Sequence, residues 1–238
     1  MKFDLFIKKL NGKKPMLAVL VDPDKYNADL IYLAEKNKTS CFLVGGSELK
    51  KNNIGVVIKD IKKRTKLPVI IFPGDEKQVT AVADGIFILS LLSGNNPEYL
   101  IGKHLKATPL IRKAKLPSLP VAYVLVDGGK KSTTEKVSKT KPLNAGDIKS
   151  IKNTSITGEL LGFKAVYLEA GSGAGRTVNA KVVREVKKNI GIPLIVGGGI
   201  DSFEKAKQFI SCGANMIVVG NALEKNIELI IEIGKAFN

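Results

Sequence analysis

The chain contains no tryptophan, one histidine (His104) and two cysteines, Cys41 and Cys212, in 238 residues. Two cysteines in a chain of this length exclude a disulfide scaffold and a zinc ribbon, and apolar neighbours indicate that both are reduced thiols. A single histidine excludes metal clusters with several histidine ligands. A Ser-His-Asp triad could be built only on His104. We expect His104 on a helix surface or in packing.

Long apolar runs are also lacking. The longest, such as Met16–Val21 and Gly85–Leu92, fall far below the roughly 18 residues that span a bilayer, and the N-terminal MKFDLFIKKL has no continuous apolar signal core. Hydrophobic residues at 44% and charged residues at 25% are nevertheless typical of globular proteins and exclude disorder and collagen. We expect a soluble, cytoplasmic protein.

Arginine is scarce, because the 38 basic residues comprise 34 Lys and four Arg, against 22 acidic residues, for a net charge of +16. Arginine supplies the bidentate and stacking contacts that read bases, so this composition disfavours nucleic-acid recognition. Residues 95–152 hold twelve basic and four acidic side chains, which is half of the net charge. Two interpretations stay open: a solvated lysine-rich surface, or a segment that meets an anionic substrate or a lipid-headgroup surface.

Short continuous apolar runs recur along the chain, with helical spacing between them. Continuous runs are typical of parallel strands covered on both faces. The eight runs are Met16–Val21, Cys41–Val44, Val69–Phe72, Gly85–Leu89, Val121–Val126, Ala165–Glu169, Leu194–Val196 and Met216–Val219. The helical stretches are Asp29–Lys36, Asn53–Lys63, Asn96–Leu105, Gly146–Leu161, Ala180–Asn189, Phe203–Cys212 and Leu223–Phe237.

Eight strands at about 30 residues per unit predict an α/β fold, a (β/α)8 TIM barrel, whose usual length is roughly 250 residues. A doubly wound open sheet is the main rival. The interval from Val69 to Gly85 is too short for a full helix with its loops, so the third crossover should be irregular. No linker or change in composition divides the chain, which predicts a single domain over residues 1–238.

One long polar stretch, Asp127–Pro142, follows the fifth predicted strand. In a barrel this position lies at the C-terminal rim, where active sites occur. The stretch is either a basic lid over an anionic ligand or a loop without function.

Glycine-rich segments follow the last three predicted strands: YLEAGSGAG from Tyr167, VGGGI from Val196 and VGNA from Val219. Glycine lets backbone N–H groups approach a phosphate, and a helix that follows directs its positive end to the same place. Barrels often hold phosphate at these loops. The three segments together predict a phosphate site.

A carboxylate, Glu169, ends a strand that otherwise reads as barrel core. It would act as a general base or accept a hydrogen bond from a substrate hydroxyl, and the alternative is an ion pair with a lysine at the rim. Tyr167, two residues earlier, should share the inward side of the strand. It would donate a hydrogen bond to the same ligand or fill the barrel.

Oxygen ligands follow the first two strands, in VLVDPDK and LVGGSE. Magnesium is typically held by one or two carboxylates together with water and substrate phosphates. Asp22 and Ser47 therefore suit a Mg²⁺ ion that is bound to a diphosphate. Capping of a turn is the alternative for Asp22 and the favoured role for Asp24.

Together these segments resemble the geranylgeranylglyceryl phosphate synthase family of barrel prenyltransferases. The resemblance is carried by VDPDK, VGGS, YLEAGSG, GGGI and VGNA, which are distributed over essentially the whole chain. GGGI and VGNA occur singly in many phosphate-binding barrels, whereas YLEAGSG with VDPDK and GGS is much more specific. The YLEAGSGA form is similar to the larger of the family's two groups.

The resemblance implies a modified barrel with an irregular third crossover that joins a prenyl diphosphate, foremost geranylgeranyl diphosphate, to the 3-hydroxyl of sn-glycerol 1-phosphate. This Mg²⁺-dependent transferase reaction releases diphosphate and is the first step of ether-lipid, and so phospholipid, biosynthesis. The resemblance implies Asp22 and Ser47 as metal ligands and Glu169 as the catalytic residue. It implies that glycerol 1-phosphate is bound by Tyr167, Leu168, Glu169, Ala170, Gly171, Ser172, Gly173, Gly198, Gly199, Gly220 and Asn221.

The family also implies a homo-oligomer, a dimer or a hexamer. Transient contact with a membrane surface is an open expectation, and no nucleic-acid partner is expected. One alternative function is a phosphate-binding isomerase or lyase barrel that acts on a sugar phosphate and needs no apolar channel. The other is a non-enzymatic binder of polyanions or membrane surfaces, which would leave Asp22, Ser47 and Glu169 unexplained.

Overall fold

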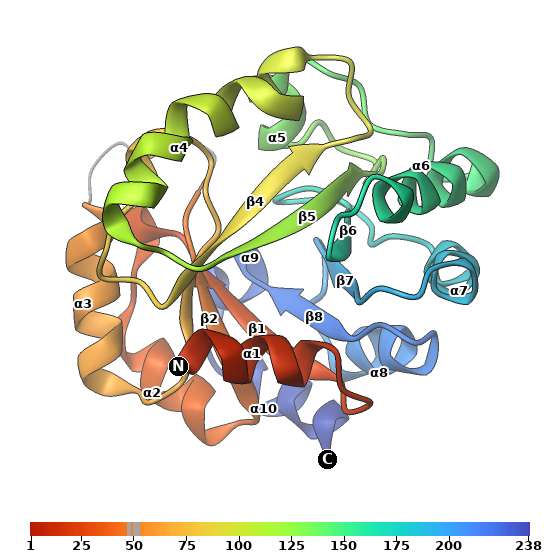
Figure 1. The fold of residues 1–238 in the computed structure, drawn as a ribbon. Helices are drawn as coiled ribbons and strands as arrows, with labels where there is room; N and C mark the ends of the chain where they lie inside the picture. Colours follow the sequence, from red (N-terminus) through yellow and green to blue (C-terminus); the bar gives the residue numbers. More distant parts are fainter. Residues whose placement is uncertain (47–48, 50–52) are drawn as a thin grey trace.

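Eight parallel strands form a closed barrel in which the strands follow one another in chain order (Figure 1). The computed structural model describes residues 1–46, 49 and 53–238. The barrel closes between its first and last strands, where Met16 lies opposite Met216 and Ala18 opposite Val218. The prediction of a (β/α)8 barrel is confirmed, and the open doubly wound sheet is wrong.

The strands agree closely with the apolar runs, and three of the eight have the predicted bounds. The strands are β1 (Met16–Val21), β2 (Thr39–Val44), β3 (Val69–Ile71), β4 (Gly85–Leu91), β5 (Ser118–Leu125), β6 (Ala165–Glu169), β7 (Leu194–Gly197) and β8 (Met216–Val219). The α-helices are α1 (Lys2–Leu10), α2 (Ala28–Lys36), α3 (Ile54–Arg64), α4 (Lys103–Ala114), α5 (Thr133–Ser138), α6 (Ile148–Leu160), α7 (Ala180–Asn189), α8 (Phe203–Ser211), α9 (Asn221–Lys225) and α10 (Leu229–Gly234). Shorter turns are the 3₁₀ helices η1 (Pro23–Lys25), η2 (Glu76–Gln78) and η4 (Lys235–Phe237) and the π-helix η3 (Glu98–Gly102).

Alternate strand residues divide into two apolar layers. On β6, Tyr167 joins the cluster inside the barrel, whereas Val166 and Leu168 pack outward against the helices. Both layers are buried, because helices cover the outside of the sheet and side chains fill its inside. The continuous apolar runs therefore reflect burial on both faces.

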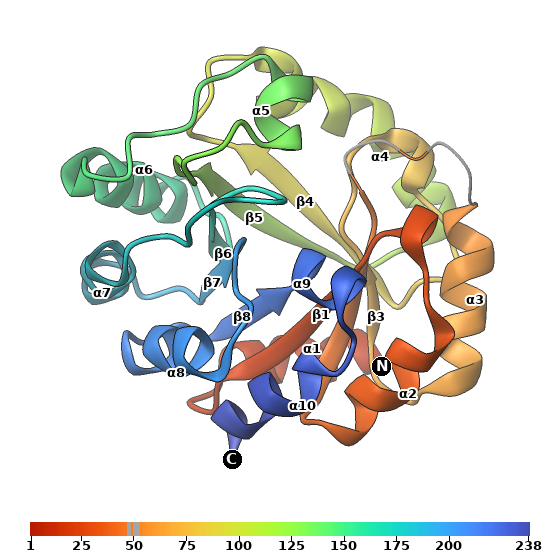
Figure 2. The same cartoon turned by 180° about the vertical axis from the view of Figure 1, so that it is seen from behind.

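Helix α1 closes the N-terminal end of the barrel. Its apolar side chains Phe3, Phe6 and Leu10 recur at helical spacing and are buried beneath the strands. The Phe3 ring lies so close to Gly85 that any β-carbon at that position would collide with it. Figure 1 shows α1 in front of the strands, and Figure 2, from behind, shows α5 and α9 in front. The opposite end of the barrel is therefore surrounded by α5, α9 and the strand-to-helix loops.

The third crossover is irregular, as predicted. Residues 72–84 connect β3 to β4 and contain no α-helix, only the single turn η2. The outward side chains Ile86 and Ile88 of β4 are therefore not covered by a helix of their own crossover. They face α4, which follows β4 and leaves space between helix and sheet.

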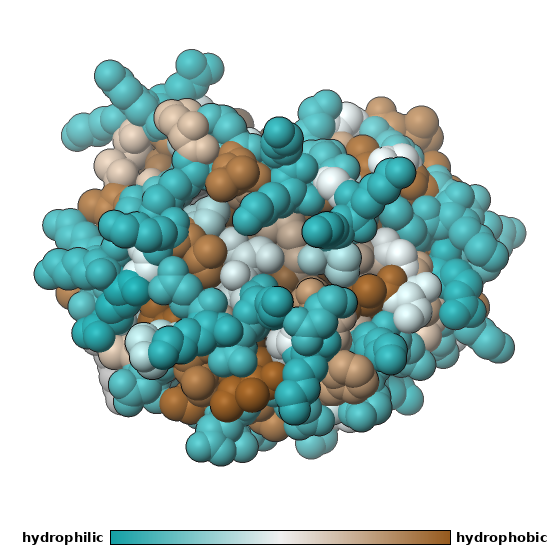
Figure 3. Space-filling view, turned by 90° about the horizontal axis from the view of Figure 1, so that it is seen from below, coloured by the Kyte–Doolittle hydropathy of each residue, from teal (hydrophilic) through white to brown (hydrophobic). Residues whose placement is uncertain are grey.

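The surface in Figure 3 is hydrophilic over most of the face shown, with smaller apolar areas near its lower edge and at its upper right. In the described part of the chain, no helix has both the length and the apolar composition that a bilayer crossing requires.

Candidate active site

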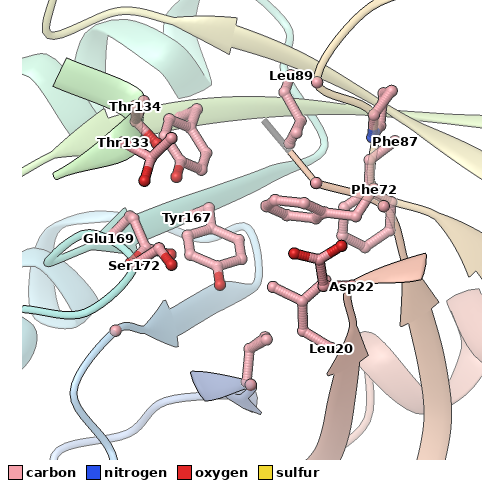
Figure 4. A pocket seen from close by; sticks show the side chains of 18 of the residues that line it. Leu20, Asp22, Phe72, Phe87, Leu89, Thr133, Thr134, Tyr167, Glu169 and Ser172 are labelled. Atoms are coloured by element: carbon pink, nitrogen blue, oxygen red, sulfur yellow. The ribbon is translucent and has the colours of Figure 1, made fainter. Parts of the chain in front are cut away.

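A cavity of about 620 Å³ opens at the carboxyl ends of the strands. Each of the first three strands contributes a residue that directly follows it, namely Asp22, Gly45 and Phe72, and β6 contributes its last residue, Glu169. Asp22 and Glu169 reach the cavity from opposite sides, with Tyr167 and Phe72 between them (Figure 4). The cavity therefore brings together residues far apart in the sequence, as barrel active sites do.

The glycine-rich loops after β6, β7 and β8 form one wall of this cavity. Gly198 and Gly199 have φ angles of 86° and 70°, a left-handed conformation that glycine adopts without strain. The loops after β6 and β8 are joined because the Ser172 hydroxyl donates to Asn221 Oδ1 over 2.7 Å. Backbone N–H groups in such a wall suit a phosphate.

Eight of the eleven residues expected to bind glycerol 1-phosphate line the cavity: Tyr167, Glu169, Ser172, Gly173, Gly198, Gly199, Gly220 and Asn221. Three do not. The side chains of Leu168 and Ala170 lie in the outer apolar layer, because successive strand residues point to opposite faces. Gly171 donates its N–H to Glu169 Oε1 over 2.6 Å and faces Ser132, so it supports the carboxylate.

Glu169 is a buried carboxyl group with an exposed fraction of 6%. Burial raises its pKa to about 7, and the hydrogen bond from the Gly171 N–H and the nearby Tyr167 hydroxyl oppose this rise. The expected alternative, an ion pair with a lysine at the rim, is not present among the described residues. A carboxyl group that ionises near neutral pH is suited to accept a proton.

This burial should cost the folded protein stability. Below pH 4.5 Glu169 is protonated in both folded and unfolded chains, but above about pH 7 only the folded chain must bury a charge. We expect Glu169→Gln to raise the free energy of unfolding by roughly 1 to 3 kcal/mol at pH 8, and by much less at pH 5. Urea unfolding at both pH values measures this, with Glu185→Gln, a partly exposed glutamate outside the cavity, as control. The same difference at both pH values would contradict the buried charge.

Aromatic side chains form the floor of the cavity. Ring centroids of Phe72, Tyr123 and Tyr167 lie 5.3 to 6.2 Å apart. The Tyr167 hydroxyl is buried, and no described group accepts or donates within 3.5 Å of it, although it lies near enough to Glu169 to lower the pKa of that carboxyl group. It is therefore available to a bound ligand, because buried polar groups are normally paired. Gly197 leaves room for this hydroxyl, since any β-carbon there would collide with it.

Asp22 caps the turn after β1, as one of its two expected roles required, and its metal-binding role stays a prediction. Its Oδ1 accepts a hydrogen bond from the Asp24 N–H over 3.0 Å and so caps η1, while its carboxylate points into the cavity (Figure 4). Partial burial raises its pKa, and the backbone hydrogen bond opposes this. Asp22 is thus the N-cap residue of η1.

The cavity is rich in carboxylates although the chain is strongly basic. Six acidic side chains line it against four lysines: Asp22, Asp75, Glu76, Glu169, Asp201 and Glu224, with Lys25, Lys103, Lys130 and Lys225. Counting only pairs within the described chain, two of these carboxylates form ion pairs, Glu224 with Lys25 and Asp201 with Lys205, both at 2.7 Å. A polyphosphate bound beside Asp22 would therefore need a cation, and one carboxylate with phosphate oxygens is the usual magnesium environment.

The described residues contain no group of three or more His, Cys, Asp or Glu side chains that could hold a metal ion by themselves. Asp22 therefore fits a magnesium ion only together with substrate oxygens. The second expected ligand, Ser47, lies outside the described residues.

The polar stretch Asp127–Pro142 contains a helix that the sequence did not predict. Helix α5 begins after Ser132, whose hydroxyl accepts from the Glu135 N–H, so the Ser-x-x-Glu spacing of a capping box was the missed signal. The segment is joined to the β6 loop, because Gly128 O accepts from the N–H groups of Gly175 and Arg176.

This segment contributes Lys130, Thr133, Thr134 and Val137 to the cavity. The stem of Lys130 packs over Gly175, and its ammonium has no ion pair or hydrogen bond to the residues that the structure describes. Its position beside the glycine wall favours contact with an anion. The segment is therefore part of the cavity wall, and its role as a basic lid stays a prediction.

Away from the glycine wall the cavity becomes an apolar groove between β4 and α4. Its walls are Val79 from the third crossover, Ile86 and Ile88 from β4, and Ala107 and Ile111 from α4. The sequence did not reveal this groove, because Asn96–Leu105 was expected to end before Pro109 and α4 continues to Ala114. The amphipathic spacing of His104, Ala107 and Ile111 could have indicated a longer helix with one face toward the sheet.

His104 lies half-buried on this groove. Its Nε2 lies 2.9 Å from Ser90 Oγ, and the Ser90 hydroxyl donates a hydrogen bond to the Leu100 carbonyl oxygen. Burial lowers the pKa of the imidazole. A neutral imidazole that donates to Ser90 satisfies both groups. The expected packing role of His104 is in agreement with this geometry.

The fold and the cavity together define the chain as a (β/α)8-barrel enzyme whose ligand site is built from the loops at the carboxyl ends of the strands. A model of the PcrB family matches residues 11–236. The geranylgeranylglyceryl phosphate synthase of Zunongwangia profunda is 46% identical over 93% of this chain and 96% of its own length. That of Pyrococcus horikoshii is 37% identical over 94% and 89%.

A solved structure also resembles this chain throughout. It is (S)-3-O-geranylgeranylglyceryl phosphate synthase from Thermoplasma acidophilum in complex with sn-glycerol 1-phosphate, with a TM-score of 0.90 and 34% identity over 100% of this chain and 98% of that one. The chain belongs to the PcrB family, whose geranylgeranylglyceryl phosphate synthases are prenyltransferases. The resemblance seen in the sequence is confirmed.

Proposed function

We propose that the chain transfers a long prenyl group, most suitably geranylgeranyl, from its diphosphate to the 3-hydroxyl of sn-glycerol 1-phosphate, with Mg²⁺. The observation that carries this proposal is a single cavity with two chemically different parts, a polar glycine wall and an apolar groove. A sugar-phosphate isomerase would use the first and have no need of the second. The relative from Thermoplasma acidophilum, solved with sn-glycerol 1-phosphate, supports the first substrate.

The residues suggest how each substrate is held. The glycine wall, Ser172 and Asn221 would hold the phosphate of glycerol 1-phosphate, and the Tyr167 hydroxyl would bond to its glycerol oxygens. The prenyl tail would lie between β4 and α4, with its diphosphate toward Asp22. A magnesium ion held by Asp22 would neutralise the leaving diphosphate.

The reaction would then proceed between Asp22 and Glu169, over the aromatic floor. The bond between the allylic carbon and the diphosphate oxygen breaks, and the diphosphate leaves with both electrons. The glycerol 3-hydroxyl forms the new ether bond to that carbon, and Glu169 takes its proton. The faces of Phe72 and Tyr167 would stabilise positive charge on the allylic group during this step.

Glycerol 1-phosphate should bind without magnesium, because backbone N–H groups supply the positive potential in the glycine wall. We expect Gly220→Val to weaken this binding at least tenfold, since a valine would occupy the cavity where the phosphate sits. Its β-carbon would lie 3.4 Å from Leu20, an ordinary contact, so the fold should survive. Calorimetry in excess chelator measures the affinity.

The variant Gly146→Val, outside the cavity, serves as control. Gly198 is less suitable, because a side chain there would collide with the Glu169 carboxylate and take a left-handed φ. If folded Gly220→Val bound glycerol 1-phosphate with unchanged affinity, the phosphate would not bind at the glycine wall.

Filling the apolar groove should shorten the prenyl chain that the enzyme accepts. Ala107 faces the groove and is buried, whereas Leu105 lies on the same helix with 66% of its surface exposed. We expect Ala107→Phe to lower kcat/KM for geranylgeranyl diphosphate about tenfold or more relative to farnesyl diphosphate, because the ring would occupy the volume of the tail end. Leu105→Phe should leave the ratio unchanged. If Ala107→Phe also left the ratio of the two kcat/KM values unchanged, the prenyl tail would not lie in this groove.

A further inference from the structure

Gln78 is a buried polar residue in the irregular third crossover. It ends η2, and only 1% of its surface is exposed. Burying an amide costs free energy unless its N–H and C=O groups are both paired. An apolar residue of the same length would fill this position at lower cost, so the partners of the amide matter.

Both ends of the Gln78 amide bond to the same residue. Nε2 donates to the Gly46 carbonyl oxygen over 2.7 Å, and the Gly46 N–H donates to Oε1 over 3.4 Å. The side chain therefore pairs with the backbone of Gly46 as a neighbouring strand would. It does so just after β2 has ended, where the sheet no longer supplies backbone partners to this residue.

Gly46 lies beside the carboxylate of Asp22. A β-carbon at Gly46 would stand 3.4 Å from Asp22 Oδ1. The preceding residue, Gly45, donates its N–H to the Val21 carbonyl oxygen over 3.1 Å, so the turn after β2 is bonded to the end of β1 at its start. Gln78 bonds the next residue, Gly46.

We propose that Gln78 is a positioning residue for the diphosphate end of the site. It fixes the Gly46 backbone against Asp22 and so sets the space in which a diphosphate and its cation meet that carboxylate. The inference rests on the proposed function for the identity of this ligand. It also gives the irregular crossover a role, because a regular helix in its place would not bring a side chain from η2 to the β2 turn.

Two variants separate this role from general stability. Gln78→Met keeps the volume and removes both hydrogen bonds, while Gln78→Glu keeps an acceptor for the Gly46 N–H and places a second oxygen against the Gly46 carbonyl. The matched control is Asn215→Leu. Asn215 also bridges backbone groups with its amide, accepting from Leu194 N and donating to Leu10 O, but at the N-terminal end of the barrel.

Calorimetry should measure two ligands for each protein: inorganic diphosphate with Mg²⁺, and glycerol 1-phosphate with chelator. We expect Gln78→Met to bind magnesium diphosphate about tenfold more weakly, Gln78→Glu at least as weakly, and both to bind glycerol 1-phosphate within twofold of wild type. Asn215→Leu should bind both ligands normally. Amide exchange of Gly46 should be faster in Gln78→Met, which removes the acceptor of its N–H, with or without ligand.

A folded Gln78→Met with unchanged magnesium diphosphate affinity would overturn the inference. So would an equal loss of both ligands, which indicates a merely structural role. If Gln78→Met does not fold, Gln78→Glu serves instead. Unchanged magnesium diphosphate affinity, or an equal loss of both ligands, in that variant would overturn the inference. A wild-type protein that binds no magnesium diphosphate would overturn the proposed function and this inference with it, whereas wild-type binding with unaffected variants overturns the inference alone.

Discussion

Glu169→Gln is expected to lower turnover by about 10²- to 10⁴-fold, the usual contribution of a general base. The substitution keeps the shape of the side chain and its acceptor for the Gly171 N–H, so the loop should stay in place. It removes the group that takes the proton of the attacking hydroxyl. Steady-state assays of lipid product, with native circular dichroism as a check on folding, measure the loss.

The pH dependence of kcat/KM tests the role of Glu169 as general base in a second way. Because burial raises the pKa of Glu169 to about 7, kcat/KM of the wild type should rise with pH and level off above that value. The residual activity of Glu169→Gln should lack this rise. Glu76→Gln, which removes another carboxylate of the cavity, is the control. A folded Glu169→Gln with turnover within about threefold of wild type would show that the base lies elsewhere.

Asp22→Asn is expected to lower turnover about 100-fold at moderate magnesium and to raise the magnesium concentration needed for half activity at least tenfold. An asparagine oxygen still accepts from the Asp24 N–H, so η1 keeps its cap. The charge that would attract the cation is lost. Prenyl diphosphate binding should weaken in proportion, and glycerol 1-phosphate binding should not change.

Asp75 offers a matched comparison for this variant. It lines the same cavity, and its Oδ1 caps η2 by accepting from the Lys77 N–H over 2.9 Å. Asp75→Asn should change the magnesium requirement by less than about twofold. Full wild-type activity in excess chelator would contradict both the metal role of Asp22 and the proposed chemistry of the leaving group.

The barrel was predictable because burial on both faces makes each parallel strand a continuous apolar run. β1, β6 and β8 have the predicted bounds for this reason. Helix α1 was not predicted, although Phe3, Phe6 and Leu10 recur at helical spacing. The expected helix Leu223–Phe237 is divided into α9, α10 and η4, since apolar spacing does not mark the break at Asn226.

The polar half of the site followed from the sequence, whereas the apolar half did not. Glycines and a carboxylate at strand ends are local signals, and Glu169, Gly198 and Gly220 indeed meet in one cavity. The groove depends on how α4 packs over β4, which no local pattern records. Likewise, the bond from Gln78 to Gly46 joins residues 32 positions apart, and only the closed barrel brings them together.

The most direct test of the central claim incubates the protein with geranylgeranyl diphosphate, Mg²⁺ and radiolabelled sn-glycerol 1-phosphate, and measures label in the extracted lipid together with released diphosphate. The proposed function predicts one diphosphate released for each labelled ether lipid, and little product when sn-glycerol 3-phosphate replaces the 1-phosphate. No labelled lipid with any prenyl diphosphate from ten to thirty-five carbons in length, from a folded protein that binds glycerol 1-phosphate, would contradict it.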